Sequence, residues 1–366
     1  MLVNEEVVGL VEKTKIKHYR RANTKVSEYQ PWRFSMESIV IQKPKEIKLT
    51  ERAIPEPGPG EVLIKVMASG ICGTDIHIFN GDYLGAYPVI PGHEFSGVIE
   101  STGNLVKRFK TGDRVAVEPN IACDNCVHCL NNRQNFCLNW QAVGVTLPGG
   151  MEQYVAVPEK AVFSIGDLPF DQGAFVEPLS CVVHGVERAR LRLADRVAIF
   201  GAGPIGDLIL QMARLQGAAQ ITVLENNPGR AELARELGAD LVFDRLEELQ
   251  PDTYDVVIDA TGVIPLMNRT IDFARSGGTV LLFGVPPSGK NLEVEAFKIF
   301  QKGLTLLSSF TSVRNSFQAV HLLQTGQIKV EPLISHRLPL KEMPAAIDLI
   351  ERHDPKVKKV IMLPNG

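Results

Sequence analysis

The sequence has no long apolar run, little charge imbalance and few cysteines, and each of these absences excludes a class of protein. No apolar segment approaches the length that spans a bilayer, and the N-terminus carries no apolar signal-peptide region. The 39 basic and 42 acidic residues argue against binding to nucleic acid or to an anionic membrane. Six cysteines among 366 residues are too few for a disulfide scaffold. We therefore expect a cytoplasmic, two-domain protein that binds a small molecule.

Four of the cysteines lie close together in the spacing C-x2-C-x2-C-x7-C, formed by Cys123, Cys126, Cys129 and Cys137. Four thiolates can complete a tetrahedral zinc site and leave no position for a substrate, so such a metal would brace a loop. An iron–sulfur cluster and a nucleic-acid-binding zinc ribbon are the alternatives. The last cysteine is not followed by proline, and the stretch carries only Arg133 as a base. The pattern therefore favours a structural zinc site.

A second set of metal-type ligands lies upstream, in a stretch rich in glycine and proline. Cys72 and His93 offer the sulfur and nitrogen ligands that zinc prefers, and Glu94 offers oxygen. Three ligands leave the fourth position open for water or substrate. The alternative is that a lone cysteine and a distant histidine are unrelated packing residues. We predict a catalytic metal site here, because its neighbours also suit the chemistry.

Those neighbours are Asp75, which could orient a metal-bound imidazole, and Thr74 and His77, which could pass a proton from a buried alcohol to solvent. The motifs C-G-T-D-x-H and G-H-E-x-x-G resemble those of the zinc-dependent medium-chain alcohol and polyol dehydrogenases, and the similarity covers residues 36–366. The resemblance implies an active dehydrogenase whose zinc polarises the alcohol.

The second half of the chain carries a dinucleotide-binding pattern. A β-branched run ends at Phe200, glycines follow, and apolar residues then recur at helical spacing. Such glycines permit a tight turn and bring a pyrophosphate close to the backbone at a helix N-terminus. The predicted cofactor-binding residues are Gly201, Gly203, Pro204, Ile205, Gly206, Glu225, Arg230, Thr261 and Gly284.

Glu225 ends the next predicted strand and decides the expected cofactor. A carboxylate at this place can accept both ribose hydroxyls of NAD but repels a 2′-phosphate, so we predict NAD over NADP. Arg230 either touches the adenosine ribose, as the resemblance implies, or is an exposed helix charge. Thr261 and Gly284 lie at the ends of later strands and should line the cofactor crevice.

The resemblance implies an α/β fold in two domains. A GroES-like, mainly β catalytic domain would comprise residues 36–184 and 319–366. A Rossmann domain with a doubly wound parallel sheet would comprise residues 185–318. Residues 1–35 are basic and poorly patterned, and we expect a dispensable extension. The family also forms homodimers and homotetramers, and either is expected here.

The resemblance also bears on the substrate. Glu177 lies where classical alcohol dehydrogenases carry a cysteine. A glutamate at this position is typical of the sorbitol-like branch. Either Glu94 or Glu177 could be the direct zinc ligand. The expected reaction is oxidation of a polyol to the ketone, although Ser312 replaces an arginine of polyol dehydrogenases and Arg314 is displaced from that position. Threonine 3-dehydrogenase, glucose dehydrogenase and a non-catalytic binding protein remain alternatives.

Overall fold

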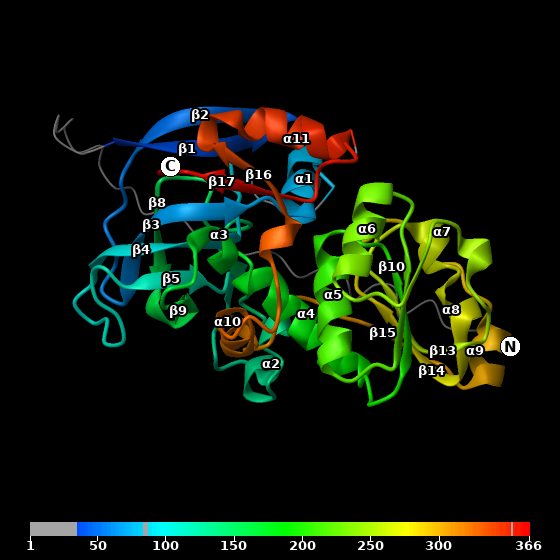
Figure 1. Ribbon diagram of the computed structural model, residues 1–366. Coiled ribbons are helices and arrows are strands. Elements are labelled where there is room, and N and C mark those ends of the chain that lie inside the picture. The colour runs from blue at the N-terminus through cyan, green and yellow to red at the C-terminus, as the bar shows by residue number, and fades with distance from the viewer. Residues whose placement is uncertain (1–34, 83–86, 353) are drawn as a thin grey trace, which may run out of the picture. The chain divides into compact units, whose positions relative to one another are not determined.

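The computed structural model of the protein describes residues 35–82, 87–352 and 354–366 (Figure 1). Residues Ser35–Gly366 form one compact unit. The predicted N-terminal extension lies outside the described residues apart from Ser35, and its dispensability stays a prediction. None of the described helices is both long enough and apolar enough to cross a membrane.

The first large sheet is mainly antiparallel and contains seven strands within the described residues, in the order β16-β17-β3-β4-β5-β9 with β8 paired to β3. The apolar residues of β3 alternate with less buried ones, so that Val62, Ile64 and Val66 pack beneath Phe95. These strands are β3 (Glu61–Gly70), β4 (Glu94–Thr102), β5 (Arg114–Val117), β8 (Tyr154–Pro158), β9 (Val162–Ser164), β16 (Ile334–Pro339) and β17 (Lys359–Leu363).

Two small hairpins accompany this sheet. The predicted opening strands form an antiparallel pair, and a second pair lies beside the cysteine-rich stretch. Their strands are β1 (Ser35–Lys43), β2 (Glu46–Ala53), β6 (Asn120–Ile121) and β7 (Gln141–Ala142). The return of β16 and β17 to the first sheet agrees with the expectation that the chain's end rejoins the catalytic part.

The second large sheet is parallel and has the order β12-β11-β10-β13-β14-β15 among the described residues. Its central strand β10 is completely buried from Val197 to Phe200, as expected for a strand covered on both faces. This order is that of a doubly wound Rossmann sheet, as predicted. The strands are β10 (Arg196–Phe200), β11 (Gln220–Leu224), β12 (Leu241–Phe243), β13 (Tyr254–Asp259), β14 (Ala274–Leu282) and β15 (Thr305–Ser308).

Helix α4 joins the two sheets. Its residues contact β4 and β5 of the first sheet and β14 of the second, and it lies beside α5 and α10 (Figure 1). The described helices are α1 (Gly73–Asn80), α2 (Val127–Leu130), α3 (Phe170–Gly173), α4 (Val176–Ala189), α5 (Pro204–Leu215), α6 (Pro228–Glu236), α7 (Ile264–Met267), α8 (Thr270–Phe273), α9 (Ala296–Lys302), α10 (Ser316–Gln324) and α11 (Met343–Glu351). The exact boundary between the two predicted domains stays a prediction.

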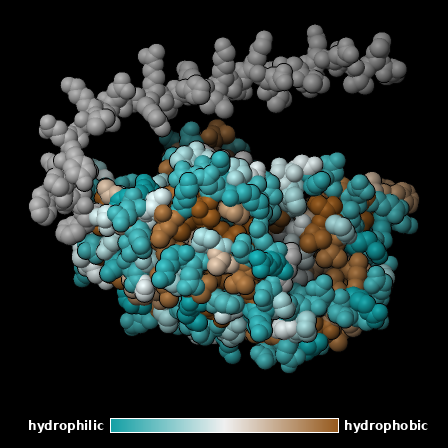
Figure 2. Space-filling model, turned by 90° about the horizontal axis from the view of Figure 1, so that it is seen from above, coloured by the Kyte–Doolittle hydropathy of each residue, from teal (hydrophilic) through white to brown (hydrophobic). Residues whose placement is uncertain are grey.

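Hydrophilic residues cover most of the face shown in Figure 2, where hydrophobic residues gather in separate patches. The most exposed large hydrophobic residues include Leu193, which is 83% exposed, and Phe300 of α9, which is 81% exposed. A single exposed apolar residue such as Leu193 is normal on a protein surface, whereas Phe300 lies beside the exposed Phe297, with ring centroids 6.2 Å apart.

Candidate functional site

The predicted catalytic ligands lie together. One ligand atom each of Cys72, His93 and Glu94 falls within 4.8 Å of the others. The register of the first sheet produces this cluster, because Gly70 at the end of β3 pairs with Glu94 at the start of β4. Cys72 follows Gly70 by two residues and His93 precedes Glu94, so the two connections meet at one strand end. A sulfur, a nitrogen and an oxygen donor in this arrangement fit zinc.

Asp75 lies beside this ligand cluster and hydrogen-bonds to the backbone that carries it. Its carboxylate is fully buried and accepts backbone hydrogen bonds from Cys72 at 2.8 Å and Gly92 at 3.1 Å. Oδ1 of Asp75 lies 3.6 Å from Nδ1 of His93. Burial lowers the pKa of His93, but the charges of Cys72 and Asp75 outweigh burial and hold that pKa well above its usual value. Asp75 therefore lies where a carboxylate that orients the imidazole is expected.

Glu94 has a partner that the sequence did not reveal. Lys359 of β17 is almost completely buried and forms an ion pair with Glu94. A Cβ on Gly70 would lie 2.5 Å from Oε2 of Glu94 and 2.8 Å from Cε of Lys359, so the absence of a side chain there makes room for the pair. Burial lowers the pKa of Lys359, whereas Glu94 and Cys72 raise it, and the net shift is upward.

Glu177 approaches the cluster from helix α4. It is buried in the first turn of this helix, and its Oε1 accepts a hydrogen bond from Sγ of Cys181 at 3.3 Å. The pKa of Glu177 is raised to about 7, chiefly by burial, with His93 lowering it and the charges of Glu94 and Glu118 raising it. Among the described residues, Glu177 does not belong to the group whose ligand atoms lie within 4.8 Å of one another. The geometry thus favours Glu94 as the third ligand.

A cavity of about 320 Å³ connects this cluster with the Rossmann sheet. Thr74 and His77 line it, both from helix α1, which begins directly after Cys72. They are three residues apart and therefore lie on one face of the helix. Nδ1 of His77 lies 3.0 Å from Oδ1 of Asp82. The opposite wall contains Ile205, Thr261 and Gly284.

The glycine motif forms a close turn before helix α5. Gly201 has φ of 94°, a left-handed conformation that favours glycine. A Cβ on Gly206 would lie 1.9 Å from the carbonyl oxygen of Gly201, so only glycine permits this helix to approach the strand. Gly203 precedes Pro204, the first residue of α5. This turn can cradle a pyrophosphate at the helix N-terminus.

The acidic residue of the cofactor pattern is fixed by backbone groups. Glu225 follows β11, is 7% exposed, and accepts hydrogen bonds from the backbone N–H groups of Ala202 at 2.9 Å and Asn227 at 2.8 Å. Arg230 is half-buried rather than an exposed helix charge, and its Nη2 donates to the carbonyl of Val357 at 3.1 Å.

Two strand ends complete the cofactor side. Oγ1 of Thr261 donates to Asp259 at 2.5 Å, directly after β13. A Cβ on Gly284 would lie 2.1 Å from the backbone nitrogen of Gly262. The segments after β13 and β14 therefore approach so closely that only glycine fits at position 284. Ligands bind outside the carboxyl ends of parallel strands, which is where these residues lie.

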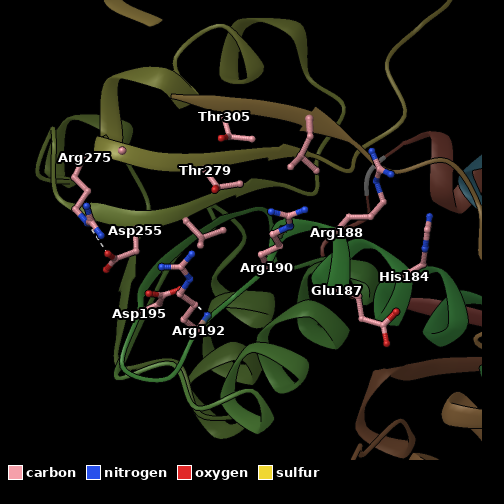
Figure 3. Close-up of a pocket in the computed structure, with 14 residues that line it drawn as sticks. His184, Glu187, Arg188, Arg190, Arg192, Asp195, Asp255, Arg275, Thr279 and Thr305 are labelled. Atoms are coloured by element: carbon pink, nitrogen blue, oxygen red, sulfur yellow. Dashed lines mark hydrogen bonds and ion pairs between the residues drawn. The ribbon is translucent and has the colours of Figure 1, made fainter. Parts of the chain in front are cut away.

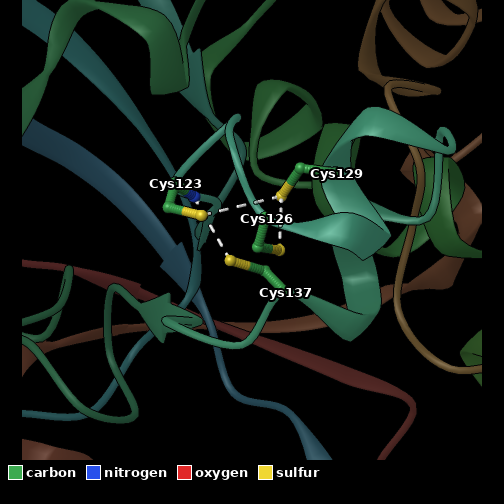
Figure 4. A group of neighbouring side chains, drawn as sticks. All are labelled: Cys123, Cys126, Cys129 and Cys137. Carbon is green, nitrogen blue, oxygen red and sulfur yellow. Dashed lines mark hydrogen bonds between the residues drawn. The ribbon is translucent and has the colours of Figure 1, made fainter.

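The four clustered cysteines form a second, closed group (Figure 4). Their sulfurs lie within 4.8 Å of one another, and none of the six cysteines is in a disulfide. Sγ of Cys137 accepts backbone hydrogen bonds from Cys123 at 3.2 Å and Asn139 at 3.3 Å. Four converging sulfurs that also accept N–H groups fit a tetrahedral metal site without a free position.

Several residues of the cleft escaped the sequence analysis. Phe310 lines the cavity and stacks on Phe136 of the cysteine stretch, with ring centroids 6.2 Å apart. The ring centroid of Trp140 lies 6.3 Å from that of Phe310. Nε1 of Trp140 donates to Oδ1 of Asn120 at 3.0 Å. No local motif marks these contacts, because they join segments far apart in the sequence.

A larger cavity of about 730 Å³ contains none of the predicted site residues (Figure 3). Its lining includes Arg188, Arg190, Arg192 and Arg275. Its acidic residues already have partners, since Asp255 pairs with Arg275, Asp195 accepts the backbone N–H of Arg192, and Glu187 accepts from two side-chain amides. The smaller cavity is therefore the candidate active site, because the ligand cluster lines it together with Ile205, in the first turn of α5, and the strand-end residues Thr261 and Gly284.

Comparison with known proteins identifies the family of this chain. The alcohol dehydrogenase GroES-like domain matches residues 58–167, and the zinc-binding dehydrogenase domain matches residues 204–325. D-altritol 5-dehydrogenase of Agrobacterium fabrum is 36% identical over 84% of this chain and 94% of its own length. The chain belongs to the zinc-binding alcohol dehydrogenase family.

Two further members of the family are similar along most of their length. D-arabinitol dehydrogenase 1 of Uromyces fabae is 34% identical over 86% of this chain and 93% of its own. A zinc-binding dehydrogenase of Sinorhizobium meliloti 1021, solved with NADP, is 36% identical, with a TM-score of 0.86 over 90% of this chain and all of its own. These matches confirm the predicted fold class and the predicted dehydrogenase family.

Proposed function

We propose that this zinc-binding dehydrogenase oxidises a secondary alcohol of a polyol to the ketone, with NAD as hydride acceptor. One observation carries the proposal: the Cys72, His93 and Glu94 cluster and the strand-end residue Thr261 face the same cavity. Relatives named for D-arabinitol, D-altritol and sorbitol support a polyol substrate.

Cys72, His93 and Glu94 would hold the catalytic zinc, and the four clustered cysteines would hold a structural zinc. When bound, the catalytic metal supplies a Lewis acid that lowers the pKa of the substrate hydroxyl. Thr74 would accept the proton of this hydroxyl while giving up its own hydroxyl proton toward solvent, and His77, one helical turn on, would take up the departing proton on its imidazole and release it to water. Asp75 keeps the ligands in place through its hydrogen bonds to the two backbone segments.

Glu94 is the proposed third ligand, and Glu177 the residue that faces the metal from across the cavity. Lys359 balances the charge of Glu94 in a buried environment, where an unpaired carboxylate would be costly. Among the described residues, Glu177 lies outside the group of converging ligand atoms, and its Oε1 accepts a hydrogen bond from Cys181, which suits a residue beside the water or alcohol rather than a permanent ligand.

The glycine turn, Glu225, Thr261 and Gly284 would hold the cofactor, which accepts the hydride when bound. Glu225 is buried and fixed by two backbone N–H groups, so it cannot move aside for a 2′-phosphate without losing both hydrogen bonds. This argument favours NAD, although a relative of known structure carries NADP. The predicted contact of Arg230 with the ribose stays a prediction.

A threonine dehydrogenase is the second candidate. L-Threonine 3-dehydrogenase of Rhizobium johnstonii is 33% identical over 84% of this chain. Threonine is a secondary alcohol, so the same metal, proton path and cofactor would serve it. The two candidates differ in the charged groups of the substrate.

The proposal is tested by following reduction of NAD and NADP with the zinc-loaded protein. The substrate panel holds arabinitol, altritol, sorbitol, threonine, glucose and 2,3-butanediol. We expect NADH formation with a polyol at a kcat/KM well above those of threonine and glucose. A clear preference for threonine would replace the polyol proposal but keep the mechanism. Zinc-loaded protein that reduces neither cofactor with any of these compounds would contradict the proposed function.

We also propose a homodimer or homotetramer, as the resemblance implies. Exposed Phe297 and Phe300 on α9 are compatible with burial in a subunit contact. Light scattering coupled to gel filtration would test this, and a monomer at micromolar concentration would contradict it. The predicted cytoplasmic location stays a prediction.

A further inference from the structure

The cavity between the ligand cluster and the cofactor side has an unusual charge balance. Among the described residues that line it there is no lysine and no arginine. Its charged residue types are the carboxylates Glu94 and Glu177 and the imidazoles His77 and His93. Residues 83–86, which the structure does not describe, have the sequence Tyr-Leu-Gly-Ala and contain no lysine or arginine; residues 1–34 and 353 also lie outside the described residues.

The nearest cations are already engaged elsewhere. Lys359 is buried behind the cluster, where it pairs with Glu94. Arg314 lies 3.8 Å from Asp124 in the cysteine-rich stretch and does not line the cavity. Ser312, two residues before Arg314, does not line the cavity either, and its hydroxyl donates to Glu118 at 2.7 Å. No guanidinium therefore points into the substrate end of the cleft among the described residues.

The outer wall of the cavity is largely apolar. It contains Trp140, Ala142, Val145 and Phe310, and the polar groups beside them are the amide of Asn120 and the uncharged hydroxyls of Ser309 and Thr311. This amide is held from two sides, since Oδ1 accepts from Trp140 at 3.0 Å and Nδ2 donates to Glu118 at 2.6 Å. A fixed amide beside aromatic rings suits the hydroxyl groups and C–H faces of an uncharged polyol.

Phe310 is held in this wall by the cysteine-rich stretch. Its carbonyl accepts a hydrogen bond from Nδ2 of Asn135 at 2.9 Å, and its ring stacks on Phe136. The wall is therefore built on a loop braced by the four cysteines and does not need a substrate to form.

An anionic substrate would be poorly accommodated in this cavity. A phosphate or carboxylate at the outer end would lose its hydration without gaining a lysine or arginine, and it would lie in the same cavity as Glu177. The relatives differ in this respect, because some are named for charged substrates, such as D-arabitol-phosphate dehydrogenase of Enterococcus avium and L-galactonate-5-dehydrogenase of Escherichia coli.

We propose that the cleft selects uncharged polyols and rejects their phosphate esters and the corresponding sugar acids, because its apolar wall and fixed Asn120 amide hold no lysine or arginine among the described residues. This inference rests on the proposed polyol dehydrogenase activity. It also separates the two candidate functions, since no described lysine or arginine lines the cleft to pair with the carboxylate of threonine.

The test compares matched substrates with the zinc-loaded full chain and NAD. Arabinitol is compared with arabinitol 5-phosphate and arabinonate, and sorbitol with sorbitol 6-phosphate and gluconate. We expect kcat/KM for the better neutral polyol to exceed that of its charged partners by about 100-fold or more, a difference in transition-state binding of about 2.7 kcal/mol. Calorimetric titration into the enzyme–NADH complex should give the same order of binding without turnover.

A charge placed in the cleft should reverse part of this preference. Ser309 lines the cavity, and its hydroxyl has no hydrogen-bond partner. In Ser309→Arg, the ratio of kcat/KM for the phosphate ester to that for the neutral polyol should rise by about tenfold or more. Ser309→Gln is the matched control, because it adds length without charge and should leave the ratio near that of the wild type.

Wild-type activity that is equal or greater on a phosphate ester or sugar acid would overturn the inference while leaving the dehydrogenase function intact. If no polyol, charged or neutral, is turned over or bound, the polyol function itself fails, and the inference fails with it. The two failures are distinguishable, because only the first shows cofactor reduction with a polyol derivative.

Discussion

The two cysteine-containing sites show how the same side chain serves two purposes. Cys72 lies with one histidine and one carboxylate at the edge of a cavity, in a group that leaves a coordination position open. The four clustered cysteines face one another, and backbone N–H groups fill the remaining contacts of Cys137. A metal coordination shell that protein ligands complete suits a structural role, and a shell with an open position suits catalysis.

The residues around the open cluster and around the closed cluster also differ. The open cluster has a fully buried carboxylate behind it and an ion pair beside one ligand. The closed cluster lies on a loop whose Phe136 stacks on Phe310, and Phe310 in turn lines the candidate substrate cavity. The closed site should therefore affect catalysis only through the shape of the cavity wall. The following substitutions separate the two roles.

The largest expected effect is on turnover in Cys72→Ser. Loss of the thiolate ligand should lower kcat by about 10³-fold or more, because the metal supplies several kcal/mol of transition-state stabilisation. The melting temperature should stay close to that of the wild type. Cys181→Ser is the matched control, since this thiol lines the same cavity outside the ligand cluster. Comparable losses in both variants would contradict the assignment.

The closed site should respond in stability. In Cys126→Ser we expect unfolding to become easier by about 2 kcal/mol or more, with a fall in melting temperature of about 4 °C or more. The folded fraction should keep its kcat but show a higher KM, because Phe136 no longer holds Phe310 firmly. His128→Gln, in the same loop and outside the cluster, should leave the melting temperature near that of the wild type. Calorimetry and steady-state kinetics would check both variants, and an unchanged melting temperature in Cys126→Ser would argue against a bracing metal.

An intermediate effect should distinguish the two glutamates of the open site. Glu94→Gln should weaken zinc binding in the cleft by about 10- to 100-fold, because it removes an oxygen ligand and leaves Lys359 buried without its partner. Glu177→Gln should retain most of the zinc. Competition with a chromogenic chelator measures both affinities. A larger loss in Glu177→Gln would make Glu177 the ligand.

The smallest of these effects should follow from interrupting the proton path at its outer end. His77→Gln should lower kcat by about tenfold, less than the usual loss of about 10²-fold or more for a general acid or base, because water can reach the His77 side chain, which is 26% exposed, and replace part of its role. Added imidazole should restore part of the rate. A variant with unchanged kcat and a full solvent isotope effect would place the proton path elsewhere.

Much of the fold follows from local patterns. The glycine turn before α5 and the buried run of β10 appear in consecutive residues, and the cysteine spacing defines a lobe without any knowledge of its surroundings. The meeting of Cys72 with His93 depends on the β3–β4 register, which pairs Gly70 with Glu94. The residue types alone were compatible with this metal cluster, and the family resemblance was needed to predict that Cys72 and His93 meet.

The remaining features depend on contacts between distant segments. Lys359 reaches Glu94 because β17 joins the sheet beside β3, and a lysine in an apolar strand gives no hint of its partner. The wall formed by Asn120, Trp140 and Phe310 joins three separate segments. Since these side chains shape the substrate end, the substrate was the part least accessible to sequence analysis.

The most direct test of this account is a zinc titration of the metal-stripped protein, with polyol-dependent NADH formation and thermal stability followed in the same samples. We predict two equivalents of bound zinc in the wild type, one restoring stability and the other restoring turnover. Cys72→Ser should bind one equivalent and regain stability without activity. Full activity in Cys72→Ser, or full wild-type activity with zinc bound only to the four cysteines, would contradict the account.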